Sequence, residues 1–377
     1  RKNSFKDIQR NIENRIFGDA MSYKWKFESN YPWPDEFIAC VKMVLTDWPE
    51  HPDDMSKGVY NIMWWTAEED LDRIMQNITK ADGLTGEKGL QAYSPIALRE
   101  TARLITLYSL YDSSILQKII KKYPGFLQGI RFFINTWFLN SHYPGCGDCG
   151  NLNAPSRGIP FSPGYVYFEH NIAESSIVYS FEGFIWKLYE ITGDIDLIRM
   201  IYNSENFDMQ KCFSTDFSLN DTPENIREKV VVLMEEKGSE LNQESIDYKK
   251  WKLAVLHSGK GKNRRCAYLD YDSGGVHGHN DGMNIGIFAK GENLMPDFGY
   301  PPAHRPGGWS SKFFYWYRSA ASHNTVIVDG KEHRDFCHVQ RDVNGGQGVI
   351  CESGETVLWG IGSWVKAVAA NDPLIAG

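Results

Sequence analysis

The spacing of apolar residues changes near residue 250, and this change limits what the chain can fold into. Before it, apolar residues recur at the helical spacing of three and four, and after it they form short runs punctuated by glycine. The helical stretches are 34–45, 67–78, 94–111, 126–139, 173–192 and a charged helix with a linker at 215–248, and the strand-like runs are 254–256, 267–269, 284–288, 325–328, 349–351 and 357–359. We therefore predict a helical part over residues 1–247 and an antiparallel β part over residues 248–377.

Composition is compatible with two domains. The 377 residues are 42% hydrophobic, enough for a sizeable core, and the 14% aromatic content fits either core packing or contact with sugar rings. The net charge of −8 argues against general binding to nucleic acid or to an anionic membrane, and no apolar run is long enough to span a bilayer. A polyanionic substrate stays compatible with this charge, because a cationic groove can be local.

The seven cysteines are an odd number and do not form the pattern of a disulfide framework. Cys146 and Cys149 make a C-x-x-C spacing without a second pair, which we interpret as a loop. The sequence starts at Arg1 and carries no signal peptide, so we expect a fragment or a processed chain.

Polar residues that could act in catalysis or metal binding occur in three segments of the β part. His277 and His279 lie in GGVHGHND at 274–281, Asp297 lies in MPDFGY at 295–300, and His323 lies in SHNTVIVDG at 322–330. Residues two apart in a strand point to the same side, so both histidines are expected to face one cavity. His279, Asp297 and His323 are ligands that zinc accepts, which leaves His277 as an acid or base. Alternatively, these are polar residues at strand ends, satisfied by the backbone.

These three segments resemble the heparinase II/III-type polysaccharide lyases. The resemblance implies an α/α toroid, incomplete here, followed by an antiparallel β-sandwich that is truncated, because only about 130 residues remain for it. It also implies that His277 is the catalytic histidine. His279, Asp297 and His323 would be ligands of a structural zinc, which some members of the family lack.

Two further catalytic candidates follow from the same resemblance. The segment 82–94, DGLTGEKGLQAYS, is similar to the family loop that presents a catalytic tyrosine before a helix, and Tyr93 occupies that place. Asn30 precedes a helix and would neutralise the substrate carboxylate. A core aromatic is the alternative for Tyr93, and the pair His170 and Asn171, which also fits a helix N-cap, is the alternative for Asn30.

The implied function is a lyase that cleaves a uronic-acid-containing glycan by β-elimination. This reaction needs donors that neutralise the carboxylate, a base for the C5 proton and an acid for the leaving oxygen. Two alternatives remain: a cupin-like metal-dependent oxygenase, because H-x-H opens its motif, and a catalytically inactive carbohydrate-binding protein of the same fold. The expected partner is an anionic polysaccharide, with neither nucleic acid nor membrane, and the resemblance implies a periplasmic or secreted protein.

Overall fold

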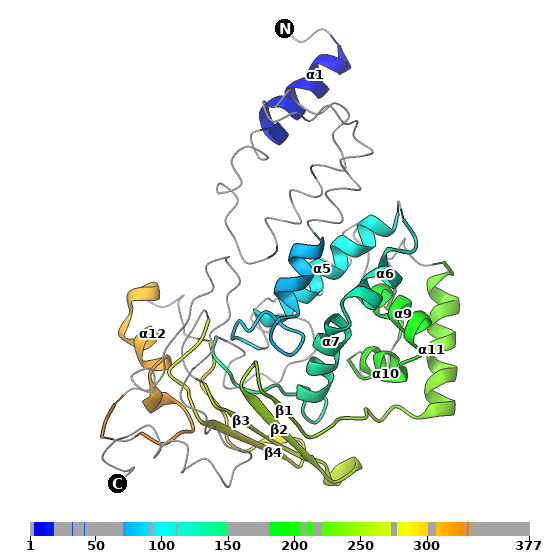
Figure 1. Ribbon diagram of the computed structural model, residues 1–377. Helices are drawn as coiled ribbons and strands as arrows, with labels where there is room; N and C mark the ends of the chain where they lie inside the picture. Colours follow the sequence, from blue (N-terminus) through cyan, green and yellow to red (C-terminus); the bar gives the residue numbers. More distant parts are fainter. Residues whose placement is uncertain are drawn as a thin grey trace.

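The computed structural model describes residues 4–18, 32, 41, 71–90, 93–110, 112–148, 181–204, 209–210, 212–213, 220–272, 277–300, 307–327 and 329–331. Within these residues most helices come first and the sheet follows (Figure 1). The helices are α1 (Phe5–Ile12), the π-helix η1 (Glu13–Phe17), α5 (Ser94–Ser109), α6 (Ile115–Lys122), α7 (Gly125–Thr136), α9 (Phe181–Thr192), α10 (Ile195–Ser204), α11 (Pro223–Lys237) and α12 (Lys312–Tyr317), with short 3₁₀ turns η3 (Gly261–Asn263), η4 (Gly308–Ser310) and η5 (Ala320–Ser322). Residues 71–78 are also helical.

Local sequence explains where these helices begin and end. The side chain of Thr222 caps α11 by accepting a hydrogen bond from the amide of Asn225, and a proline stands in the first turn. The helix ends at Gly238, whose φ of 72° is costly for other residues. Gly193 follows α9 with a φ of 68° in the same way.

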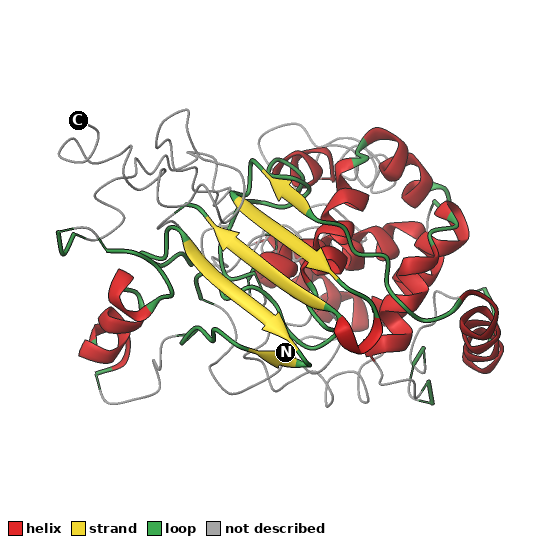
Figure 2. Cartoon of the chain, turned by 90° about the horizontal axis from the view of Figure 1, so that it is seen from below, coloured by secondary structure: helices red, strands yellow, loops and turns green. Residues whose placement is uncertain are grey.

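The strands form one antiparallel sheet in sequence order, β1-β2-β3-β4-β5 (Figure 2). They are β1 (Ile246–Tyr248), β2 (Leu253–Ser258), β3 (Arg265–Asp270), β4 (Asn284–Ala289) and β5 (Glu292–Asn293). Along β4 buried and half-buried residues alternate, as expected for a strand with one face on the core. Gly286 of β4 is required by close packing, because a Cβ there would stand 2.1 Å from the ring of Tyr268.

The main hydrophobic core of the described residues joins the helices to the sheet. Phe132 of α7 stacks on Tyr248 of β1 with ring centroids 4.0 Å apart and meets Trp251 edge-on. Phe138 packs against Phe288 of β4 at 5.0 Å. The helices from α5 to α11 therefore lie beside the sheet, while α12 lies away from them (Figures 1 and 2).

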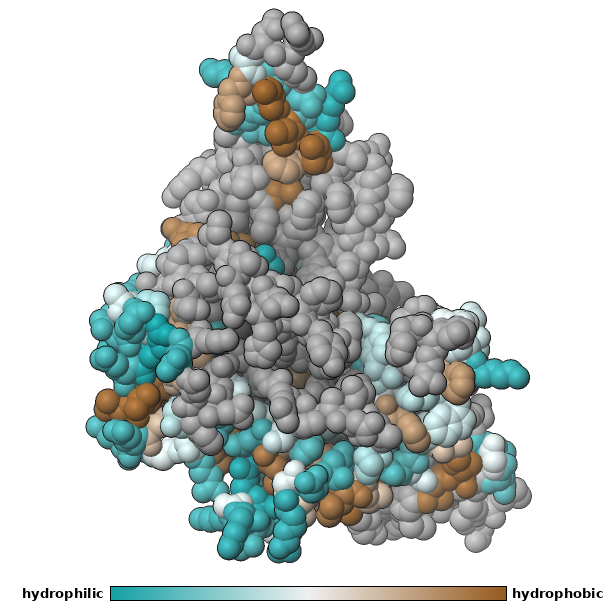
Figure 3. Space-filling model, turned by 180° about the vertical axis from the view of Figure 1, so that it is seen from behind, coloured by the Kyte–Doolittle hydropathy of each residue, from teal (hydrophilic) through white to brown (hydrophobic). Residues whose placement is uncertain are grey.

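The N-terminal helix α1 lies apart from the other described elements (Figure 1). Its apolar side chains, which include Phe5, Ile8 and Ile12, are exposed, and Figure 3 shows apolar atoms gathered at this end of the molecule. None of the described helices is both long and apolar enough to cross a membrane.

The expected mixture of helices and an antiparallel sheet is confirmed. Helices α5, α7, α9 and α11 and strands β2, β3 and β4 lie where the sequence predicts them. The strand expected at 325–328 is wrong for residues 325–327, which are irregular. Side chains hold this segment instead: the amide of Asn324 donates to Oδ1 of Asn284, and Thr325 donates to the carbonyl of Gly282. The stretch 34–45, apart from Val41, and the runs 349–351 and 357–359 lie outside the described residues.

Candidate active site and metal centre

The two histidines of the H-x-H motif lie in the connection between β3 and β4, outside any strand. The expectation that a strand turns both toward one side is therefore wrong. His277 has a φ of 54°, in the left-handed region that non-glycine residues seldom adopt. The connection is anchored by Arg318, which donates to the carbonyl of Gly278 and accepts a backbone bond from Asn280.

Asp148 brings the two histidines together. Its Oδ2 lies 3.0 Å from Nδ1 of His277, and its Oδ1 lies 2.8 Å from Nε2 of His279. Burial would raise the pKa of Asp148, but the hydrogen bonds to the two histidines outweigh burial and lower it to about 2. An ionised Asp148 accepts from both rings, so it fixes their orientation and places a proton on Nδ1 of His277.

Two backbone amides of the segment that carries Asp148 donate hydrogen bonds to the histidine connection. The amide of Asp148 donates to the carbonyl of His277 at 2.8 Å, and the amide of Gly147 donates to Oδ2 of Asp281 at 2.9 Å. Gly147 has a φ of 68°, and a Cβ on it would stand 2.2 Å from the carbonyl oxygen of His277. This close approach requires glycine.

Glu87 lies on the other side of the His277 ring. Its Oε1 is 3.5 Å from Nε2 of His277 and has no hydrogen-bond partner among the described residues. Burial, with a further contribution from the negative charge of Asp148, raises the pKa of Glu87 to about 8. His277 therefore lies between an ionised carboxylate and a carboxyl that is protonated at neutral pH, an arrangement typical of acid–base sites.

Tyr93 packs directly on His277. It stands at the N-cap of α5, and its ring lies parallel to the imidazole, with centroids 3.4 Å apart and an angle of 11° between the planes. Its hydroxyl is 2.8 Å from the hydroxyl of Tyr300. Tyr93 and Glu87 are buried, whereas the side chain of His277 is 23% exposed and so can meet a substrate.

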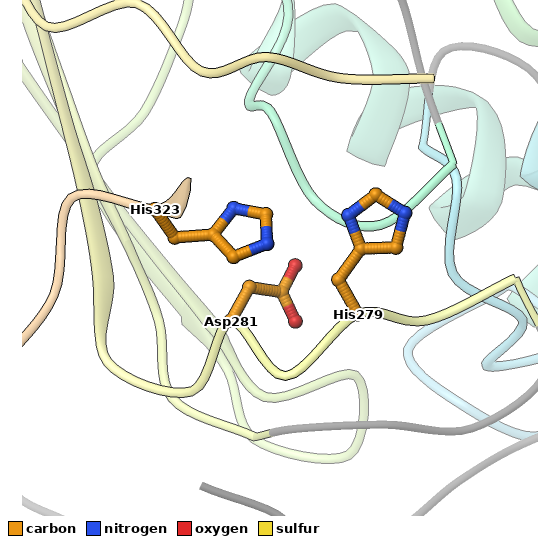
Figure 4. A group of neighbouring side chains, drawn as sticks. All are labelled: His279, Asp281 and His323. Carbon is orange, nitrogen blue, oxygen red and sulfur yellow. The ribbon is translucent and has the colours of Figure 1, made fainter. Parts of the chain in front are cut away.

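A His/Asp cluster adjoins these residues. His279, Asp281 and His323 each offer a ligand atom, and these atoms lie within 4.8 Å of one another (Figure 4). Nδ1 of His279 is buried without a hydrogen-bond partner among the described residues, while Asp148 occupies Nε2 of the same ring. A buried imidazole nitrogen facing a carboxylate and a second imidazole suits a divalent metal, and the carboxylate behind the ring is the usual outer partner of such a ligand.

Asp297 lies one step behind this cluster. Its Oδ2 is 2.8 Å from Nδ1 of His323 and accepts from Asn284, and its Oδ1 accepts the amide of Gly299. Burial would raise the pKa of Asp297, but the bond with His323 lowers it below its usual value. The grouped ligand atoms are therefore those of His279, Asp281 and His323, and Asp297 contacts the group through His323. The expected ligand set His279, Asp297 and His323 stays a prediction.

A buried cation fixes the loop that carries Glu87. Nζ of Lys88 donates to the carbonyl of Trp251 at 3.0 Å and pairs with Asp270 at 3.1 Å and Asp272 at 2.5 Å. It also lies 3.6 Å from the centroid of the Trp251 ring. Burial would lower the pKa of Lys88, but the two carboxylates raise it, so the lysine stays charged and ties the loop to the end of β3.

Sequence reasoning missed four residues of this site: Glu87, Asp148, Asp281 and Tyr300. Each stands inside a segment that the motifs already mark, beside Tyr93, Cys146, His279 and Asp297 respectively. Asn30 and the rival pair His170 and Asn171 lie outside the described residues. Where they stand relative to His277 stays a prediction.

One part of the chain matches a known protein family. Residues 242–368 match the family model described as "Heparinase II/III-like, C-terminal". This match, over about a third of the chain, confirms the resemblance to heparinase II/III-type proteins that the sequence motifs indicate. No curated protein matches the chain.

Solved structures of heparinases are similar at low identity. A heparinase III with methylated lysines is 13% identical over 84% of this chain and 39% of its own, with a TM-score of 0.47. The heparan sulfate lyase HepC from Pedobacter heparinus is 16% identical over 85% of this chain and 40% of its own, with a TM-score of 0.46. The chain thus spans less than half the length of these structures.

Proposed function

We propose that the chain forms part of a polysaccharide lyase that cleaves a uronic-acid-containing glycan by β-elimination. The stacking of Tyr93 on His277, whose ring is flanked by Asp148 and Glu87, carries this proposal. A hydroxyl and an imidazole in contact can exchange protons with the same sugar from adjoining positions. The full fold we propose is an α/α toroid, residues 1–247, followed by a β-sandwich, residues 248–377.

Each step of the elimination is assigned to particular residues. The C5–H bond breaks and its proton passes to one of Tyr93 and His277. The C4–O bond breaks as the C4–C5 double bond forms, and the leaving oxygen takes a proton from the other member of the pair. Asp148 keeps Nδ1 of His277 protonated, so Nε2 is the nitrogen that exchanges a proton. Asn30 is assigned to the substrate carboxylate, where a donor makes the enolate-like intermediate tolerable.

The His/Asp cluster is assigned to a structural zinc. Nδ1 of His279, a carboxylate oxygen of Asp281 and Nε2 of His323 would hold it, with Asp148 and Asp297 orienting the two rings; in the ligand set read from the sequence, Asp297 itself is the third ligand. Zinc, when bound, supplies a cross-link between the β3–β4 connection and the segment after α12. This fixes His277, two residues from His279, at the catalytic position. An anionic polymer substrate and the resemblance to the heparinase II/III-like family support a periplasmic or secreted location.

The test is a screen of the protein against alginates, glycosaminoglycans and plant or algal polyuronates for new ultraviolet absorbance from the unsaturated product. His277→Ala and Tyr93→Phe should each lower the rate about 10²-fold or more. Tyr189→Phe, which removes a hydroxyl outside the site, is the matched control and should leave the rate unchanged. Binding without new absorbance would favour the inactive carbohydrate-binding alternative, and redox-active iron in the purified protein would favour an oxygenase.

A further inference from the structure

A cavity lies at the other end of the sheet from His277. It has a volume of about 460 Å³, within the roughly 300–1,000 Å³ usual for small-molecule sites, and lies between the segment after α11 and the β2–β3 turn. Ser258 pairs with Arg265 at this end of β2 and β3, and Leu253 pairs with Asp270 at the end near the catalytic residues. Six strand residues separate the two ends by about 17–20 Å.

The cavity is strongly basic in a chain whose net charge is −8. Among its described lining residues Glu240 is the one carboxylate, and the cations are Arg199, Lys237, Lys260, Arg264 and Arg265. Charges of one sign gathered in a concave wall raise the local concentration of oppositely charged ligands. The lining therefore selects for an anion.

The cations of the cavity differ in how they are held. Arg199 is part of the wall, because its guanidinium donates to the carbonyls of Lys237 and Gly238 and pairs with Asp196. Arg264 is held by neutral acceptors, Oδ1 of Asn140 and Oε1 of Gln243. These amides position the guanidinium without cancelling its charge.

Lys260 and Arg265 stand at the rim of the cavity. Both side chains are exposed, on the two arms of the β2–β3 turn, and neither meets a carboxylate among the described residues. A positioned guanidinium with two adjustable cations fits a planar carboxylate or a sulfate, which arginine binds through paired N–H donors.

We propose that this cavity binds an acidic sugar unit of the polysaccharide, through its carboxylate or sulfate, at a distance from the cleaved bond. The identity of the polymer rests on the proposed function, whereas the preference for an acidic sugar rests on the cavity alone. Because the cavity and the catalytic residues lie at opposite ends of β2 and β3, about 17–20 Å apart along these strands, only a long chain reaches both. The cavity therefore strengthens the binding of long substrates at the catalytic residues and leaves the cleavage of short ones unaffected.

Binding is tested by calorimetric titration with an unsaturated uronate disaccharide, sulfated or unsulfated, which the lyase reaction does not consume. Lys260→Ala/Arg265→Ala should weaken one binding event tenfold or more. The matched control Lys249→Ala/Lys250→Ala removes two exposed lysines at the β1–β2 turn and should bind as the wild type does. Equal affinity in both double variants would overturn the proposal, and so would inorganic sulfate binding as tightly as the disaccharides.

Kinetics separate this proposal from the proposed function. With a long polyuronate, Lys260→Ala/Arg265→Ala should raise KM several-fold at unchanged kcat, and with a tetrasaccharide both constants should match the wild type. A protein that cleaves no polyuronate would remove the lyase assignment, while the disaccharide titration would still decide whether the basic cavity binds acidic sugars.

Discussion

At the residue scale, the imidazole of His277 meets two carboxyl groups that titrate far apart. Asp148 is held ionised by two histidines, with a pKa of about 2, and burial raises the pKa of Glu87 to about 8. In the proposed mechanism Asp148 keeps a proton on Nδ1 of His277, and Glu87 holds a proton beside Nε2 of the same ring. The pair resembles the acid–base division found where environments drive two pKa values apart.

Glu87 should make the stability of the protein depend on pH. Its folded pKa of about 8 lies above the ordinary 4.5, so the folded state binds more protons between these values. The stabilisation is fully present below pH 4.5 and is lost as the pH rises through about 8. The free energy of unfolding should fall between pH 5 and pH 8 in the wild type. In Glu87→Gln, whose side chain cannot ionise, this fall should be smaller by about 1 kcal/mol or more. Urea unfolding at both pH values measures this difference, and parallel losses in the two proteins would contradict it.

His277 and His279 stand two residues apart and should respond differently to replacement by alanine. His277→Ala should leave the melting temperature nearly unchanged and lower turnover about 10²-fold or more, because it removes a proton-transfer group. His279→Ala should lower the melting temperature and abolish the rise that added zinc produces in the wild type. Thermal melts with and without zinc and with a chelator test the assignment, which fails if zinc stabilises His279→Ala as it does the wild type.

Tyr93→Phe distinguishes a catalytic hydroxyl from a core aromatic. The substitution keeps the ring that stacks on His277 and removes only the group that meets Tyr300. We expect stability close to that of the wild type and a loss of turnover similar to that of His277→Ala. Near-normal turnover on the true substrate would mean that Tyr93 serves packing alone.

At the scale of elements, the sequence predicts regular structure well and irregular structure poorly. Strands β2, β3 and β4 follow from short apolar runs, and α5 follows from its Ser-Pro start. The rule that residues two apart share a face holds only inside strands, so it does not apply to His277 in its left-handed connection. Asp148 escapes prediction because its partners His277 and His279 are 129 and 131 residues away, and nothing local marks that contact.

The segment 145–148 should tolerate no side chain at position 147. Gly147→Ala would place a methyl group 2.2 Å from the carbonyl of His277, at a φ of 68°. The segment must then move away, which breaks the backbone bonds to His277 and Asp281 and withdraws Asp148 from both histidines. We expect the free energy of unfolding to fall by about 2 kcal/mol or more. Turnover and the amount of zinc that the protein retains should both decrease. Gly291→Ala, where a Cβ meets nothing within 4 Å although φ is also positive, is the control and should cost less.

At the scale of the whole molecule, packing continues across residues 247 and 248, where the change of hydrophobic period suggests a boundary. Phe132 of α7 shares a core with Tyr248 and Trp251, and Lys88 joins the helical part to the end of β3. The spacing of apolar residues indicates whether a segment forms a helix or a strand, but it does not indicate what that element packs against. The proposed catalytic pair depends on this contact, because Tyr93 comes from the helical part and His277 from the β part.

The two parts should therefore unfold together. Phe132→Ala removes a fully buried ring from the shared core and should cost about 3–5 kcal/mol. Because the ring contacts both parts, the helical circular dichroism signal and the tryptophan fluorescence should shift to the same lower urea midpoint. Phe313→Ala is the matched control, since that ring is 53% exposed and its loss should shift the midpoint little. If the two signals separate into distinct transitions, residues on either side of 247 form independent cooperative units, and the order of the catalytic site would not depend on their packing.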